Sequence, residues 1–423
     1  MLPFLVFSDD QGNVFSHPYL KMVVSTWDRF YLPLRHELVP KIESASFYSM
    51  PGRLPVGYNP LTGECEVVEQ WEGKRVWAAS VFMPPSYMRT ANPACVTAEN
   101  IRLPFFAYTP CGFYAGKFYA AAKRVDPRTR QLPHFYGSCE ELSELVNQRI
   151  VLRPHNRMYK HFAKCALEYG CLAAKNLFYK RWEAPLVVSG VCNARCVGCL
   201  SRQDSMECTA PHQRIDFLPS PEELAQVALD HISYAREPIL SFGQGCEGEP
   251  LLRYEIIAET LKIIRSKTDR GTLHLNSNAS LPDAVELLAG CGLDSLRVSL
   301  NSVREQYYNK YFDPQGYVFS DVCRSIHKAK KKGLFVSLNL FVFPGFTDRE
   351  DEIAALYRFI REYRIDMILL RNLNIDPQLY VDLIGQEEGN TAGLLRFVED
   401  IKKTFPALRL GYFNVPVKKA CNT

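Results

Sequence analysis

Three cysteines in the middle of this chain have a spacing that suits a metal centre. Cys192, Cys196 and Cys199 follow one another as C-x3-C-x2-C, directly after the short apolar run 185–189. Thiolates are soft ligands that favour iron–sulfur clusters, zinc or copper. A structural zinc site is normally closed by a fourth protein ligand, whereas a catalytic centre keeps one position open. The spacing therefore predicts one metal centre, and the unassigned fourth position decides which kind it is.

Polar residues also stand at the ends of the strand candidates that follow. The glycine-rich segment 243–250 contains Gly248, Glu249 and Pro250. Its glycines can expose backbone carbonyl groups, and the nearby carboxylate can complement a cation. The later strand candidates carry further polar residues at or near their ends: Asn278, Ser299, Asn301 and Asn339, with Arg297 and Arg371 as partners for a carboxylate.

An alternation of strands and helices must position these residues. Strand candidates occupy 185–189, 239–242, 272–276, 296–300, 335–343 and 367–370, with helical candidates between them. Repeated β-α units require a parallel sheet, and six of them suit a partly closed barrel whose active site lies at the C-terminal strand ends. We therefore predict an α/β fold with a partial (β/α)6 TIM-like barrel. Alternation alone also allows an open doubly wound sheet.

Three segments of different character divide the chain. Residues 1–137 show short apolar runs separated by turn signals, so we expect a β-rich or α+β accessory domain there. Residues 138–183 are expected to form a helical bridge that includes one helix from Asn156 to about Lys180. Residues 184–423 are expected to form the barrel domain with a C-terminal extension.

The composition is that of a globular protein without an export signal. Hydrophobic residues make up 47% and charged residues 23% of the chain, which excludes a disordered protein, and a net charge of +4 does not indicate a dedicated nucleic-acid binder. The N-terminus lacks the features of a signal peptide, and no run of about 18 apolar residues occurs. We therefore expect a cytoplasmic location and no membrane span. The 14 cysteines are then expected to be reduced thiols or metal ligands.

The cysteine motif and its context resemble the radical SAM superfamily. C-x3-C-x2-C after the first strand of a β/α domain is the pattern of that family, and the resemblance covers residues 184–375. It implies that Cys192, Cys196 and Cys199 hold a [4Fe–4S] cluster whose fourth iron is chelated by S-adenosylmethionine (SAM). An electron from the cluster then breaks the sulfonium bond, and the resulting 5′-deoxyadenosyl radical removes a hydrogen atom from substrate.

The same resemblance assigns the strand-end residues to SAM. Gly248, Glu249 and Pro250 are similar to the family's Gly-Gly-Glu-Pro loop, which receives the methionyl ammonium group. The remaining candidates resemble, in order along the chain, the family's SAM-contacting strand ends: Asn278, Ser299, Asn301 and Asn339. One position departs from the family, since Gly198 stands where an aromatic residue often helps to hold the adenine.

The main hypothesis is therefore a radical SAM oxidoreductase or transferase with one cluster. Its expected partners are an unidentified substrate (a small molecule, peptide or RNA) and an electron donor such as flavodoxin or ferredoxin. The N-terminal domain is expected to cap the barrel mouth. Cys208 and Cys246 are interpreted as small buried hydrophobic residues, and Cys165 and Cys171 are expected on different sides of a helix, so no second centre is predicted.

A second hypothesis is a zinc-stabilised binding protein without radical chemistry. Cys208 or His212 could close a four-ligand zinc site with the three motif cysteines. The basic stretch 151–181 could then contact RNA, although a solvated helix face explains its cations more simply.

Overall fold

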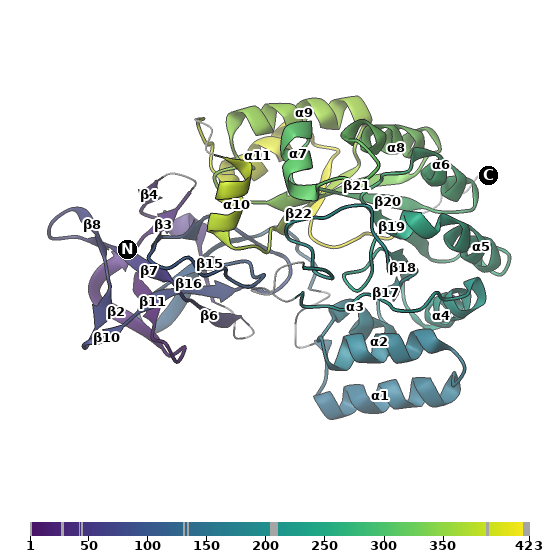
Figure 1. Cartoon of the computed structure of the whole chain (residues 1–423), viewed down its shortest axis with the longest axis horizontal. Coiled ribbons are helices and arrows are strands. Elements are labelled where there is room, and N and C mark those ends of the chain that lie inside the picture. The colour runs from purple at the N-terminus through teal and green to yellow at the C-terminus, as the bar shows by residue number, and fades with distance from the viewer. Residues whose placement is uncertain are drawn as a thin grey trace.

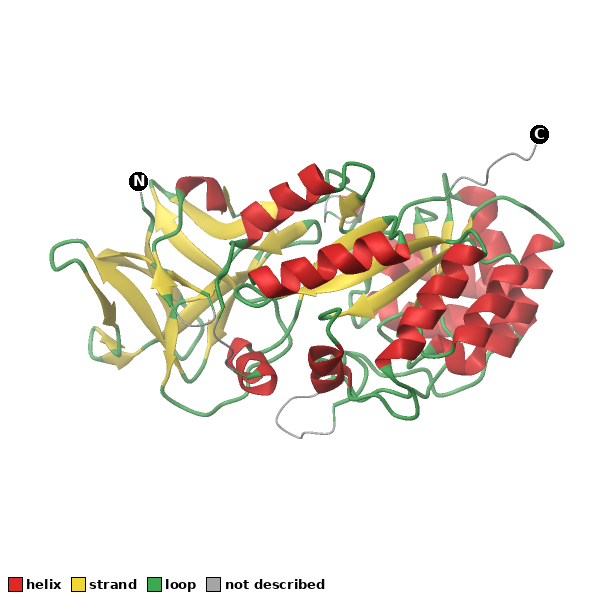
Figure 2. Ribbon diagram, turned by 90° about the horizontal axis from the view of Figure 1, so that it is seen from above, coloured by secondary structure: helices red, strands yellow, loops and turns green. Residues whose placement is uncertain are grey.

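An antiparallel β unit and a larger α/β unit follow one another along the chain (Figures 1 and 2). The structure is a computed structural model that describes residues 2–417, apart from residues 27–28, 42, 44, 130–131, 133–134, 204–209 and 386–388. Cys208 therefore lies outside the described residues.

The N-terminal unit is built almost entirely of antiparallel strands. In the described part of this unit the helical content is one short 3-10 helix, η1 (Arg35–Glu37), so the unit is β-rich rather than α+β. Two hairpins turn at residue pairs with positive φ, Glu72-Gly73 and Ala115-Gly116, which is the backbone that two-residue hairpin loops need. The strands are β1 (Phe4–Ser8), β2 (Val14–Met22), β3 (Val24–Ser25), β4 (Phe30–Tyr31), β5 (Leu38–Pro40), β6 (Ser46–Met50), β7 (Arg53–Asn59), β8 (Glu64–Val67), β9 (Gln70–Trp71), β10 (Lys74–Arg75), β11 (Trp77–Phe82), β12 (Tyr87–Arg89), β13 (Asn92–Pro93), β14 (Cys95–Thr97), β15 (Thr109–Tyr114) and β16 (Lys117–Arg124).

The helical bridge contains three helices, α1 (Cys139–Leu152), α2 (Arg157–Leu167) and α3 (Leu172–Phe178). The prediction of one helix from Asn156 to about Lys180 is wrong, because the chain breaks between α2 and α3 at Gly170, whose φ is +63°. Such a backbone ends a helix and suits glycine. The break lets both α2 and α3 turn apolar faces into the main core.

Two cations of the basic stretch are paired with acids of the barrel domain. Arg153 bonds to Asp230 and Arg157 bonds to Glu223, both on α4 (Pro221–Tyr234), with donor–acceptor distances between 2.6 and 2.9 Å. These pairs attach the bridge to the barrel. They also favour the interpretation of this stretch as a structural surface over an RNA-contacting one.

Seven parallel strands form one sheet in sequence order (Figure 1). They are β17 (Glu183–Leu186), β18 (Ile239–Phe242), β19 (Thr272–Ser277), β20 (Ser295–Leu300), β21 (Phe335–Val342), β22 (Met367–Asn372) and β23 (Arg409–Gly411). A doubly wound sheet reverses its strand order at a switch point, which this sheet does not do. Among the described strands no pairing joins β23 to β17, so the barrel is open. The predicted partial barrel is confirmed; the short strand β23 was not predicted.

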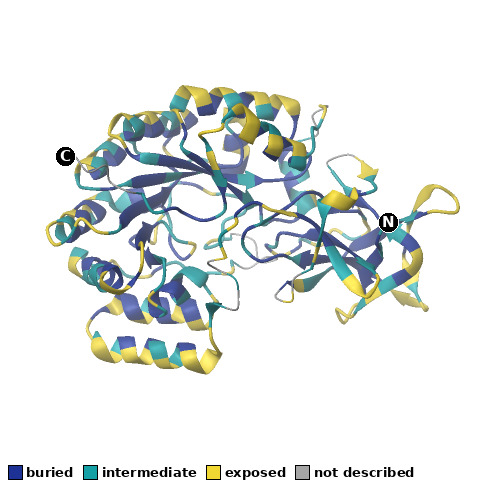
Figure 3. Ribbon diagram, turned by 180° about the vertical axis from the view of Figure 1, so that it is seen from behind, coloured by how far each residue is buried: buried dark blue, intermediate teal, exposed yellow. Residues whose placement is uncertain are grey.

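Helices cover the outer face of this sheet, and their exposed sides face solvent (Figure 3). Besides α4 and the 3-10 helix η3 (Pro250–Arg253), they are α5 (Tyr254–Arg265), α6 (Pro282–Gly290), α7 (Glu305–Phe312), α8 (Phe319–Lys331), α9 (Glu350–Tyr363), α10 (Pro377–Ile384) and α11 (Leu394–Thr404). Each connection between consecutive strands contains at least one of these helices, which makes it long enough for the next strand to run parallel to the one before it.

The inner face of the barrel is polar. The register pairs Asn276 with Arg297, Ser299 with Asn339, and Phe341 with Arg371, so these residues of neighbouring strands share one face. The residues between them are apolar and buried against the helices: Leu275, Leu296, Val298, Leu338, Leu340 and Leu370. A barrel interior filled with branched apolar side chains would be a closed core. This interior instead offers hydrogen-bonding groups to a ligand.

The β unit contacts the segment that leaves β22. Arg89 donates from its backbone N–H to Asn372 Oδ1 (2.9 Å), and Arg53 forms a 2.9 Å ion pair with Asp376 in which both side chains are at most 4% exposed. Leu103 also donates its backbone N–H to Asp376 (3.0 Å). The β unit is therefore attached beside the C-terminal end of the barrel strands.

Candidate functional site

The cysteine loop follows β17 at the C-terminal edge of the sheet. Its backbone is held by the end of α7, since Arg195 donates to Phe312 O and Val197 to Tyr311 O, both at 3.0 Å. A Cβ at Gly198 would lie only 2.5 Å from Oη of Tyr311, whose ring is 3% exposed. The glycine at this position is therefore required by the tight approach of the loop to α7.

The three thiols form a donor set that suits a centre larger than one ion. Among the described residues, the sulfur atoms of Cys192, Cys196 and Cys199 do not all lie within 4.8 Å of one another. A single tetrahedral zinc ion draws its sulfur ligands to within about 4 Å of one another. The wider arrangement fits a cluster.

The thiols also have the electrostatics of cation ligands. Burial, together with repulsion from Cys199 and Cys192, raises the pKa of Cys196 well above its usual value. Burial acts the same way on Cys199, but hydrogen bonds from Ser201 and Arg214 outweigh it and lower the pKa of that thiol. A positive centre between the thiols would remove the repulsion and favour three thiolates.

The glycine-rich loop after β18 packs directly against the cysteine loop. Glu247 is 3% exposed and accepts hydrogen bonds from four backbone N–H groups, those of Val188, Ser189, Gly243 and Gln244, at 2.7 to 3.2 Å. Burial raises the pKa of the Glu247 carboxyl to about 7, and these four N–H groups oppose that rise. The side chain thus fastens the loop after β18 to the end of β17.

Gly248 brings the two loops into backbone contact. Its N–H donates to Ser189 O at 2.7 Å, and the next N–H, that of Glu249, donates to Val191 O at 2.8 Å. A Cβ on Gly248 would overlap the carbonyl of Val191, so a larger residue does not fit.

Glu249 connects the loop to the end of β19. Its carboxylate accepts from the Ser277 hydroxyl (2.6 Å) and from the N–H groups of Asn278 (2.8 Å) and Leu251 (3.0 Å). Burial raises the pKa of this carboxyl to about 7, against the effect of those bonds. Both carboxylate oxygens already have partners within the protein, which gives Glu249 a positioning role.

A cavity of about 380 Å³ lies in front of these loops and reaches into the barrel. Its lining includes nearly all of the residues predicted from the sequence: Cys192, Cys196, Cys199, Gly248, Glu249, Pro250, Asn278, Ser299 and Asn339. Asn301 is not part of the lining. It is 1% exposed and donates to Tyr307 O (3.0 Å) and Tyr380 Oη (3.3 Å).

Two lining amides differ in what they can offer a ligand. Asn278 donates to Asn193 Oδ1 (2.8 Å) and so supports the cysteine loop. Asn339 donates to Ser299 Oγ (3.4 Å), while its buried Oδ1 has no hydrogen-bond partner among the described residues. A buried acceptor without a partner is costly, so Asn339 Oδ1 is positioned to accept from a bound molecule.

Two arginines give part of the cavity wall a positive charge. Arg297 and Arg371 both line it, and each uses one nitrogen to hold the C-terminal segment, through Asn414 Oδ1 (3.2 Å) and Tyr412 O (3.1 Å). Burial, followed by repulsion from Arg371, lowers the pKa of Arg297 to about 10, although Glu183 lies near enough to oppose this. An anionic ligand would relieve the repulsion.

A second cavity, of about 400 Å³, adjoins Cys196 and Cys199 from another side. Four arginines line it: Arg102, Arg195, Arg202 and Arg214. Sequence reasoning missed this group because Arg102 comes from the β unit and the other three arginines, although in or near the motif, carry no spacing signal of their own.

Comparison with known proteins identifies the family that the central part of the chain resembles. Residues 186–359 match the Radical SAM superfamily. A probable GTP 3′,8-cyclase of Methanosarcina acetivorans is 29% identical over 196 residues, which cover 44% of this chain and 54% of that protein. The FeMo cofactor biosynthesis protein NifB of Klebsiella pneumoniae is 25% identical over 190 residues, 42% of this chain and 40% of that protein. The chain thus spans about half the length, or less, of these relatives.

Among solved structures, Streptococcus suis SuiB bound to S-adenosylmethionine aligns with a TM-score of 0.38 and 17% identity, over 58% of this chain and 56% of that one. The family match and the site agree that residues 186–359 form a radical SAM domain. The predicted cofactors, a [4Fe–4S] cluster and SAM, are confirmed at the level of that family. Nothing found supports the zinc-stabilised binding protein. No helix in the described ranges combines the length and apolarity needed to cross a bilayer.

Proposed function

We propose that this protein reductively cleaves SAM at a [4Fe–4S] cluster held by Cys192, Cys196 and Cys199. The observation that carries the proposal is that the three thiols, the loop 243–250 and the polar strand ends line one cavity. The cluster, when bound, supplies the electron that converts SAM to methionine and a 5′-deoxyadenosyl radical, and this radical takes a hydrogen atom from the substrate.

The protein's own residues orient SAM and keep the loops rigid. Gly248 exposes backbone to the methionyl end, Ser299 and Asn339 offer hydrogen bonds from the barrel wall, and Glu249 holds the end of β19 in place. Asn278 and Pro250 contribute at the cavity wall. Asn301, predicted as a SAM contact, would act only through Tyr307 and Tyr380, which it bonds.

The substrate class that the cavity favours is an anion. Arg297 and Arg371 repel one another in the cavity wall, and a carboxylate or phosphate would bind both. Several of the curated relatives are named GTP 3′,8-cyclases, and GTP is itself an anionic small molecule. A small anionic substrate is therefore preferred here to an RNA or a peptide, and the reaction is of the oxidoreductase or transferase type.

The electron donor is expected to approach the arginine-lined cavity beside the cluster. Arg195 is exposed there, close in sequence to Cys196. Small electron-transfer proteins such as flavodoxin or ferredoxin can be steered by charge complementarity to such a surface. We place this reaction in the cytoplasm, where thiols stay reduced. The N-terminal β unit would cap the barrel mouth and limit water access to the reacting groups.

The experiment that tests the cluster is anaerobic reconstitution with iron and sulfide. We expect about four iron and four sulfide per chain, and a dithionite-reduced EPR signal that changes shape when SAM is added. The Cys196→Ala variant should hold little iron, while the matched Cys291→Ala variant should behave as the wild type. A wild-type protein that builds no cluster would overturn the proposal.

A further inference from the structure

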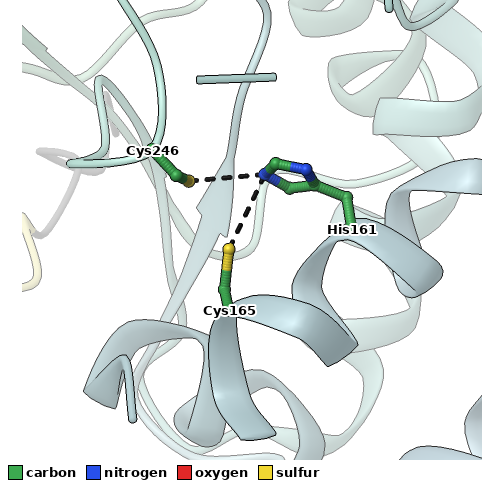
Figure 4. Close-up of side chains that lie close together, drawn as sticks. All are labelled: His161, Cys165 and Cys246. Carbon is green, nitrogen blue, oxygen red and sulfur yellow. Dashed lines mark hydrogen bonds between the residues drawn. The ribbon is translucent and has the colours of Figure 1, made fainter. Parts of the chain in front are cut away.

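A group of three metal-ligating side chains lies outside the cavity just described. His161, Cys165 and Cys246 have ligand atoms that all lie within 4.8 Å of one another (Figure 4). The Nε2 atom of His161 is 3.4 Å from Sγ of Cys246 and 3.7 Å from Sγ of Cys165. Both cysteines are buried, at 2% exposure for Cys165 and 6% for Cys246.

Two separate elements build this group. His161 and Cys165 are four residues apart on α2, so they lie one turn apart on the same face of the helix. Cys246 comes from the loop after β18, directly before Glu247. Figure 4 shows one ring nitrogen of His161 facing the sulfur atoms of both cysteines.

The distances are those of ligands around a single ion. Zinc bonds of about 2.3 Å to sulfur and 2.0 Å to nitrogen, in a tetrahedron, put a nitrogen about 3.5 Å from each sulfur. The two nitrogen–sulfur distances here bracket that value. Thiolate and imidazole are also the ligand types that zinc takes in closed structural sites.

We propose that His161, Cys165 and Cys246 bind one Zn²⁺ ion as a structural site separate from the SAM-cleaving centre. This site differs from the zinc site of the second hypothesis, which would use the three motif cysteines. Sequence reasoning interpreted Cys246 as an isolated buried residue because its partners stand about 80 positions away on α2. The i, i+4 pair of His161 and Cys165 was the one signal available.

His212 is the candidate for the fourth ligand. The loop that carries it passes beside Cys246, since Ile215 donates its N–H to Cys246 O at 2.9 Å. The His212 ring comes within 3.4 Å of the position that a Cβ would take on Gly245. Its Nδ1 atom is buried and has no hydrogen-bond partner in the described ranges. A movement of the ring toward the ion would satisfy this nitrogen and close the coordination sphere.

The site would fasten the helical bridge to the loop that shapes the SAM pocket. Cys246 stands next to Glu247 and two residues before Gly248, so an ion held by α2 would fix the loop from behind. Metal binding of this kind contributes directly to folding.

The test is the zinc content of the full chain, measured by mass spectrometry on four proteins. They are the wild type, the cluster-free variant Cys192→Ala/Cys196→Ala/Cys199→Ala, Cys246→Ala, and the control Cys291→Ala. We expect about one zinc per chain in all except Cys246→Ala, which should lose at least about five-fold. His212→Ala should weaken zinc binding more than it changes the circular dichroism spectrum.

A second readout covers the case in which Cys246→Ala does not fold. Co²⁺ added to the metal-free, folded cluster-free variant should give the visible absorption of a tetrahedral thiolate complex, and equimolar Zn²⁺ should remove it. Absence of both zinc and this Co²⁺ absorption in the cluster-free variant would overturn the inference. Zinc that is lost from the cluster-free variant yet kept by Cys246→Ala would overturn it too. That result would mean that the three motif cysteines hold zinc in place of a cluster.

Discussion

At the scale of single residues, glycines rather than charged groups set the shape of the SAM-binding edge. Gly198 and Gly248 each stand where a Cβ would meet a fixed neighbour, Tyr311 Oη in one case and the Val191 carbonyl in the other. The buried carboxylates of Glu247 and Glu249 then join the loops that these glycines bring together. Such a steric contact can be tested by adding a Cβ at the glycine and then removing the neighbouring atom that the Cβ would meet.

Gly198→Ala should lower cluster occupancy several-fold, because the added Cβ would lie 2.5 Å from Oη of Tyr311 and displace the cysteine loop. The double variant Gly198→Ala/Tyr311→Phe removes that oxygen and should recover most of the lost occupancy. Iron and sulfide per chain after reconstitution are the measurement. Gly290→Ala, where nothing lies within 4 Å, is the control. Equal occupancy in the single and double variants would contradict the steric explanation.

At the scale of elements, one carboxylate both caps α4 and links it to α2. Glu223 completes the capping box of α4 by accepting from the Ser220 N–H (2.9 Å), and it also accepts from the Arg157 guanidinium at the start of α2 (2.6 and 2.9 Å). The Arg157 hydrogen bonds, partly opposed by burial, lower the pKa of this carboxyl from 4.5 to about 2.

Glu223→Gln should therefore destabilise the protein by about 1–2 kcal/mol at pH 7. Because the folded-state pKa lies below the unfolded one, the stabilisation is complete above about pH 4.5 and is lost as the pH falls toward 2. Urea unfolding at pH 7, 4.5 and 3 should show the difference from wild type shrinking at low pH. Glu222→Gln, an exposed neighbour, should cost less at each pH. A pH-independent difference would contradict this account.

The barrel elements were predictable because strand, turn and polar strand end recur in one order along the chain. The cysteine loop, the loop 243–250 and Ser299 were found in this way, and they share one cavity. The break at Gly170 was missed because helical periodicity continues across it, and β23 because a three-residue strand carries almost no pattern. The role of Asn301 depends on side-chain packing around Tyr307, which sequence spacing does not encode.

At the scale of the whole molecule, one buried ion pair holds the β unit against the barrel. Arg53 and Asp376 are 4% and 3% exposed, and Asp376 also caps α10 through the Gln378 N–H (3.0 Å). Losing one partner would leave a buried charge without its counterion.

Asp376→Ala should cost about 3–5 kcal/mol in urea unfolding, because Arg53 would remain buried and charged. The double variant Arg53→Leu/Asp376→Leu should cost less than Asp376→Ala. The exposed Asp382→Ala is the control and should stay within about 0.5 kcal/mol of wild type. A double variant that is less stable than Asp376→Ala would show that the unpaired Arg53 charge is not the main cause of the lost stability.

The arginine-lined cavity makes a prediction about electron supply. Arg195→Glu should slow SAM cleavage supported by an acidic electron-transfer protein by about ten-fold at low salt, because the approach of that protein depends on complementary charge. Cleavage driven by dithionite should be unchanged, and Lys117→Glu, a charge reversal on the β unit, should change neither rate. Equal slowing with both reductants would instead indicate damage to the cluster.

The central claim, that the three thiols and the shared cavity form a SAM-cleaving centre, is tested most directly by the products. The reconstituted wild type, given dithionite and SAM, should form 5′-deoxyadenosine and methionine in equal amounts. Folded Cys196→Ala should form neither, and Cys291→Ala should match the wild type. A cluster-loaded wild type that forms no 5′-deoxyadenosine, or a Cys196→Ala variant that forms as much as the wild type, would contradict the account.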